Sequence, residues 1–131
     1  MLQPQISGFV IDDEEAIADA IAAMLTANGY ATTPFYSPAA AIDALSDTIP
    51  DFVITDFLMP EMDGLTLAGN IIQKNPKCRV IVLSGNLSAM EAHPDRHRFS
   101  VLRKPLRLSA ILAAVQREMN FDADRELPEE S

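Results

Sequence analysis

Residues 52–64 read FVITDFLMPEMDG, and this stretch decides the fold. Its first four residues are apolar and β-branched enough to form a buried strand. The run ends at Asp56, although aspartate disfavours strands and adds nothing to an apolar core. Met59-Pro60 and Asp63-Gly64 then indicate a loop. The stretch therefore predicts a core strand that carries a carboxylate at the edge of its sheet.

The rest of the chain alternates short apolar runs with amphipathic segments. Strands are predicted at residues 6–11, 30–36, 52–55, 79–83 and 99–102. Helices are predicted at residues 13–28, from Ser37-Pro38 onward, at 65–73 and at 108–119. Pro34 makes the second strand a poor central one. A fourth helix within residues 86–97 is expected to be short or mobile, because Pro94 interrupts it.

Five strands that alternate with helices imply β-α-β crossovers. We therefore expect an α/β fold, with a parallel sheet and helices on both faces. In open sheets of this kind, ligands bind beyond the carboxyl ends of the strands.

The length and composition of the chain restrict the classes of function that it can have. A chain of 131 residues suits one domain, and its formal net charge of −9 argues against a nucleic-acid or anionic membrane surface. No signal peptide or membrane span is recognisable, so we expect a cytoplasmic protein. The single cysteine, Cys78, cannot form an internal disulfide, and we expect it to be half-buried and inert. His93 and His97 are expected to be exposed.

Polar residues gather where four of the predicted strands stop. They are Asp12-Asp13, Asp56, Ser84-Gly85 and Lys104-Pro105. Carboxylates at such short distances repel one another, and this repulsion raises their pKa values unless a cation binds between them. An incomplete set of oxygen ligands suits Mg²⁺, and Lys104 supplies a charge that can hold a phosphoryl oxygen.

This ordered set, with Asp56 inside DFLMPEMDG, resembles the receiver domain of two-component response regulators, over residues 8–119. The resemblance implies a doubly wound (βα)5, flavodoxin-like three-layer sandwich with a five-stranded parallel sheet, whose middle strand is the third. We expect a stand-alone, chemotaxis-regulator-like receiver at residues 1–121, followed by an acidic, disordered tail at 122–131.

The resemblance also implies a metal site and a phosphoacceptor. Asp56 corresponds to the residue that attacks the phosphoryl group of a phosphohistidine and becomes an acyl phosphate. Asp13, Asp56 and the backbone carbonyl of Leu58 correspond to the Mg²⁺ ligands, and Asp12 assists through a bound water.

Three further positions complete the family pattern. Ser84 corresponds to the switch hydroxyl that turns toward the phosphoryl oxygens, and Lys104 pairs with the same group. The peptide bond before Pro105 is cis in the family. Val101 departs from the pattern, because this position usually holds an aromatic residue that moves with the switch hydroxyl. Phe99 lies two residues away, too far to be assumed a substitute.

The resemblance implies a signalling switch, in which a phosphoacceptor domain catalyses its own phosphorylation and dephosphorylation without being a conventional enzyme. The expected partners are a histidine kinase or histidine phosphotransfer protein and an unidentified downstream protein, with no nucleic acid and no membrane.

Three alternatives stay open. The chain could be a receiver piece of a hybrid kinase or a larger regulator, or a receiver-shaped binding module that is never phosphorylated, which the missing aromatic at Val101 favours. A hydrolase of the haloacid-dehalogenase type is disfavoured, because such enzymes need a second aspartate where this chain has Leu58.

Overall fold

The structure is a computed structural model that describes residues 5–85 and 87–126. Strands and helices alternate along it. They are β1 (Ser7–Ile11), α1 (Glu15–Ala27), β2 (Ala31–Phe35), α2 (Pro38–Ala44), β3 (Phe52–Asp56), α3 (Gly64–Lys74), β4 (Arg79–Ser84), α4 (Leu87–Glu91), the 3₁₀ turn η1 (Arg96–Arg98), β5 (Ser100–Arg103) and α5 (Leu108–Glu126).

The strands form one parallel sheet in the order β2-β1-β3-β4-β5. The predicted doubly wound fold is confirmed, with β3 as the middle strand. Pro34 lies in β2, at the edge of the sheet, where a missing backbone N–H is tolerated.

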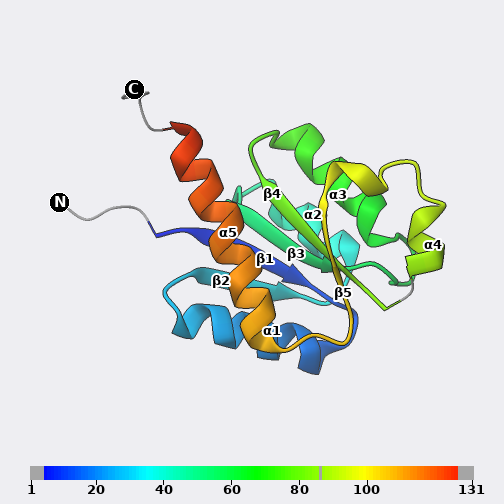
Figure 1. Ribbon diagram of the computed structural model, residues 1–131, viewed down its shortest axis with the longest axis horizontal. Coiled ribbons are helices and arrows are strands. Elements are labelled where there is room, and N and C mark those ends of the chain that lie inside the picture. Colours follow the sequence, from blue (N-terminus) through cyan, green and yellow to red (C-terminus); the bar gives the residue numbers. More distant parts are fainter. Residues whose placement is uncertain (1–4, 86, 127–131) are drawn as a thin grey trace.

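Helices cover both faces of the sheet (Figure 1), with α1 and α5 on one side and α2, α3 and α4 on the other. Successive side chains of β3 point to opposite faces of the sheet and so pack into different helical layers. Phe52 and Ile54 pack with α1 and α5, and Val53 packs with α2 and α3. Gly8 makes room for the Phe52 ring, since a Cβ there would lie 2.1 Å from the tip of that ring.

Several helix boundaries differ from the sequence-based expectation. The first helix begins at Glu15, because Asp12 and Asp13 remain in the turn after β1. The short fourth helix is confirmed: α4 ends at Glu91, before Pro94, and η1 follows. The last helix continues to Glu126, into the predicted tail, while residues 127–131 lie outside the described part. The domain boundary at residue 121 stays a prediction.

Other side chains can be compared with the expectations. Cys78 is buried, and desolvation, reinforced by the negative charge of Asp51, raises the pKa of its thiol to about 12. His97 is exposed as predicted, but the prediction for His93 is wrong, since only 15% of its side chain is accessible. Within residues 5–85 and 87–126, no helix is both long and apolar enough to cross a membrane.

Candidate functional site

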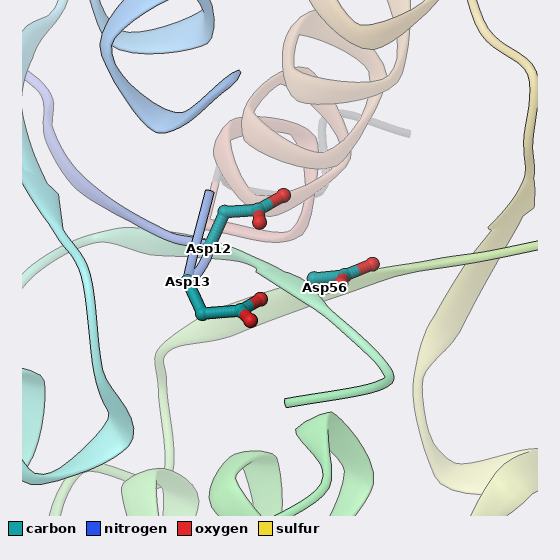
Figure 2. Close-up of side chains that lie close together, drawn as sticks. All are labelled: Asp12, Asp13 and Asp56. Carbon is teal, nitrogen blue, oxygen red and sulfur yellow. The ribbon is translucent and has the colours of Figure 1, made fainter. Parts of the chain in front are cut away.

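Three carboxylates meet at the carboxyl end of the sheet. Ile11 of β1 is paired with Thr55 of β3, so the residues that follow, Asp12 and Asp56, lie side by side. One carboxylate oxygen from each of Asp12, Asp13 and Asp56 lies within 4.8 Å of the others. Figure 2 shows the three side chains clustered at the ends of β1 and β3. The predicted convergence is therefore present.

Asp12 is the buried member of this cluster, with 2% of its surface exposed. Its Oδ1 accepts a hydrogen bond of 2.9 Å from the Glu14 backbone N–H. Its Oδ2 is buried and has no hydrogen-bond partner among the described residues. Desolvation outweighs the Glu14 hydrogen bond and raises the pKa of Asp12 to about 6.

These residues fit a divalent cation. A buried carboxylate oxygen without a partner costs free energy, and a bound cation would satisfy it. Three carboxylates provide hard oxygen ligands but not a closed shell, which is the arrangement that Mg²⁺ tolerates best because it retains waters.

Lys104 balances part of the negative charge. Its Nζ donates to Asp56 Oδ1 at 2.6 Å. Burial lowers the pKa of the Lys104 ammonium, but the hydrogen bond and charge of Asp56 outweigh this effect and leave the pKa above its ordinary value. The Lys104–Pro105 peptide bond is cis, in agreement with the expectation.

Ser84 ends β4 and is buried. Its strand lies between β3 and β5, with Leu83 paired to Asp56 and Ser84 paired to Arg103. The Ser84 carbonyl also accepts the Lys104 N–H at 2.8 Å, which ties the ends of β4 and β5 together. Ser84 therefore lies one residue beyond the partner of Asp56, and its role as a switch stays a prediction.

The loop of residues 57–63 connects Asp56 to α3 and is closed by the backbone. The Gly64 N–H donates to the Phe57 carbonyl at 2.8 Å, and a Cβ on Gly64 would lie 2.3 Å from the Asp56 carbonyl oxygen. Leu58 is 57% exposed, and its carbonyl as a metal ligand stays a prediction. The Asp-Gly pair indicated a loop in the sequence, but not this close backbone approach.

Val101 lies in β5, and Phe99 is the residue immediately before this strand. Both are partly buried against the core cluster formed with α2 and α3, and Val101 pairs with Val82. The Arg98 guanidinium also lies over the Phe99 ring, with its Cζ 5.4 Å from the ring centroid. Phe99 is thus held in the α4–β5 region.

An apolar groove of about 430 Å³ lies beside the acidic cluster. Lys104 and Pro105 line it, together with apolar residues of α1 and of the start of α5, which include Ile17, Ala20, Ile21, Leu106, Leu108 and Ile111. Leu108 is among the exposed large hydrophobic residues. This groove was not foreseen from the sequence, because its two walls come from opposite ends of the chain.

Residues 9–116 match the response regulator receiver domain family. The chain is 30% identical over 122 residues to the DNA-binding transcriptional regulator NtrC of Klebsiella pneumoniae, covering 92% of this chain and 26% of NtrC. It is 28% identical over 109 residues to the response regulator MprA of Mycobacterium sp. (strain KMS), covering 82% of this chain and 47% of MprA. The chain thus spans from about a quarter to about a half of these relatives.

Solved structures agree with this assignment. A response regulator receiver domain protein from Clostridium thermocellum superposes with a TM-score of 0.80 at 25% identity, covering 90% of this chain and 97% of that one. The signal receiver domain of an HD domain-containing protein from Pseudomonas fluorescens Pf-5 gives 0.82 at 22% identity, covering 92% and 99% respectively, and supports the fold alone. Because the family match extends over most of its length, this chain belongs to the response regulator receiver domain family.

Proposed function

We propose that this protein is a phosphorylation-dependent signalling switch that accepts a phosphoryl group on Asp56. The observation that carries the proposal is the Asp56 carboxylate, which lies at the end of the middle strand beside Asp12 and Asp13 and 2.6 Å from the Lys104 ammonium. A nucleophilic carboxylate needs neutralisation of the phosphoryl oxygens, and the Lys104 ammonium beside Asp56 supports this requirement.

The proposed donor is the phosphohistidine of a histidine kinase or a histidine phosphotransfer protein. An oxygen of Asp56 attacks phosphorus and forms an acyl phosphate. The P–N bond breaks, and its electron pair returns to the histidine ring nitrogen. This nitrogen takes up a proton from water, which gives a neutral imidazole. Bound Mg²⁺ would be held by Asp12, Asp13, Asp56 and the Leu58 carbonyl, and would neutralise phosphoryl charge.

Lys104 and Ser84 are the proposed groups that respond to the new phosphoryl group. The phosphoryl group adds nearly two negative charges, so Lys104 exchanges a carboxylate partner for a phosphoryl oxygen. The Ser84 hydroxyl, at the neighbouring strand end, donates to another oxygen. The resulting conformational change regulates a downstream protein.

The apolar groove beside Lys104 is a suitable docking surface for the donor protein. Its walls of α1 and α5 residues would let a partner bury apolar side chains while its phosphohistidine approaches Asp56. The protein is proposed to act in the cytoplasm without contacting nucleic acid or membrane through this domain. DNA binding is named as a property of the relative NtrC, of which this chain spans only 26%.

Intact-mass measurement after incubation with Mg²⁺ and phosphoramidate tests the proposal. We expect one added phosphoryl group, which is absent in Asp56→Asn and reduced by EDTA. Asp47→Asn, which neutralises an exposed carboxylate, is the matched control and should be phosphorylated like the wild type. An unmodified wild type with both small donors and a cognate kinase would refute the switch and leave a binding module. Steady hydrolysis of many organic phosphates would instead indicate a hydrolase.

A further inference from the structure

The segment between α4 and β5 reaches back to the loop that follows Asp56. His93, in this segment, has its Nε2 at 3.4 Å from Asp63 Oδ1 and at 3.2 Å from Thr66 Oγ1. Asp63 is the N-cap of α3 and the last residue of the loop, and Thr66 lies in the first turn of that helix. His93 is therefore a contact between the α4–β5 segment and the end of the loop.

Hydrogen bonds on the other side of the ring fix its orientation. The Asp95 backbone N–H donates to His93 Nδ1 at 3.0 Å, so Nδ1 is the acceptor and Nε2 carries the proton in the neutral ring. The Nε2–H thus points to Thr66 Oγ1 and Asp63. In turn, Thr66 donates its hydroxyl to Asp63 Oδ2 at 3.2 Å and its backbone N–H to Asp63 Oδ1 at 2.8 Å.

Apolar packing supports the same connection. Met90, at the end of α4, is 2% exposed and belongs to the core cluster that contains Phe57. Met59 and Met62, within the loop, pack against this cluster. Helix α4 and the loop therefore share one core cluster, and the His93 network adds a polar contact between the α4–β5 segment and the end of the loop.

The position of Asp63 matters for the site because the loop is short and closed. Gly64 follows Asp63 and donates its N–H to the Phe57 carbonyl, next to Asp56. Glu61, inside the loop, has a positive φ of 77°, a conformation that an L-residue adopts only when its surroundings hold it. The two ends of the loop are therefore tied to each other next to Asp56.

We propose that His93 is a positioning residue for the phosphoacceptor site, because it holds Asp63 and thereby the loop that carries the Leu58 carbonyl. The inference rests on the proposed function, in which that carbonyl is a metal ligand. By linkage, the site and the α4–β5 segment then depend on each other: whatever orders the loop also orders the segment. This provides a connection that does not use an aromatic residue at Val101.

Two substitutions separate the two sides of the ring. His93→Asn retains an acceptor for the Asp95 N–H but is too short to reach Asp63, whereas His93→Gln places an amide N–H near the Nε2 position. Mg²⁺ binding by isothermal titration calorimetry should show a Kd about fivefold higher in His93→Asn, at the lower end of typical coupling, and closer to wild type in His93→Gln. Thr66→Val, on an exposed position, tests the same network from α3.

Hydrogen exchange supplies a readout that a merely structural role would not change. In the wild type, Mg²⁺ should slow amide exchange in residues 88–98, and this effect should be lost in His93→Asn, with both proteins checked for folding by circular dichroism. If His93→Asn and Thr66→Val bind Mg²⁺ like the wild type, or if Mg²⁺ protects the segment equally in all of them, the inference is wrong. A wild type that neither binds Mg²⁺ nor becomes phosphorylated would refute the proposed function itself.

Discussion

Asp12 combines nearly complete burial with an acidic side chain. One of its oxygens is used by the Glu14 N–H, and the other has no hydrogen-bond partner in the described part of the chain. The cost of this arrangement is visible in the pKa of Asp12, which desolvation raises to about 6. Such a residue weakens the fold on its own, and the proposed Mg²⁺ would compensate for this cost.

Replacing Asp12 by asparagine should therefore have two opposite effects. The amide side chain keeps an acceptor for the Glu14 N–H but removes the buried charge, so the metal-free protein should gain about 1–2 kcal/mol in free energy of unfolding at pH 7. Mg²⁺ affinity should fall at least about tenfold, because a hard anionic ligand is lost. Urea unfolding with EDTA and calorimetric Mg²⁺ titration measure the two effects.

Asp43→Asn is the matched control, since Asp43 is exposed and belongs to α2. It should leave both quantities within experimental error of the wild type. An Asp12→Asn protein that is less stable than the wild type in EDTA would contradict the assignment of Asp12 as a strained, cation-requiring residue.

The element that joins the site to the rest of the fold is the start of α3. Gly64 packs so closely on the Asp56 backbone that a methyl group does not fit, whereas Gly69, in the middle of the same helix, has only Asp95 Oδ2 at 4.0 Å from an added Cβ. Glycine is therefore required sterically at position 64, whereas the packing around position 69 leaves room for a side-chain methyl group.

Alanine at the two positions should change stability in opposite directions. Gly64→Ala overpacks the turn after Asp56 and should cost about 1–3 kcal/mol, with slower phosphorylation because the loop is displaced. Gly69→Ala relieves the backbone entropy cost of a helical glycine and should add about 0.5–1 kcal/mol with phosphorylation unchanged. Thermal unfolding and intact-mass time courses measure both, and a neutral Gly64→Ala would contradict the close approach.

At the scale of elements, the sequence predicts more of the strands than of the connections between them. The β3 stretch, the edge position of Pro34 and the break at Pro94 follow from local patterns, and the strand-end rule brings Asp12, Asp13 and Asp56 together. The His93 network could not be predicted, because Asp63 and Thr66 lie 27 and more residues away and the segment of His93 is polar and interrupted by Pro94. The apolar groove was missed for the same reason: distant segments form it.

The whole molecule carries a formal net charge of −9, and its acidic site concentrates part of this charge at one edge of the sheet. Self-repulsion destabilises a compact acidic protein as pH rises, and the buried Asp12 adds to this trend. The proposed cation binding and phosphorylation would act on the same edge in opposite directions, since one removes negative charge and the other adds it. The pH dependence of stability therefore reports on the site.

Stability of the metal-free protein should fall as pH rises from about 4 to about 7, because native Asp12, with a pKa of about 6, holds its proton more tightly than the unfolded chain, with the ordinary value of 3.8. This contribution of Asp12 to stability is fully present below pH 3.8 and is lost as the pH rises through about 6.

The Asp12→Asn variant isolates this contribution, because all other charges remain. The stability of the variant should equal that of the wild type near pH 4 and exceed it near pH 7. Saturating Mg²⁺ should cancel most of the difference at pH 7, because tenfold tighter binding stabilises the wild type by about 1.4 kcal/mol relative to Asp12→Asn. Urea midpoints at four pH values, with EDTA or with Mg²⁺, measure this, and parallel curves for the two proteins would show that Asp12 does not titrate as a buried group.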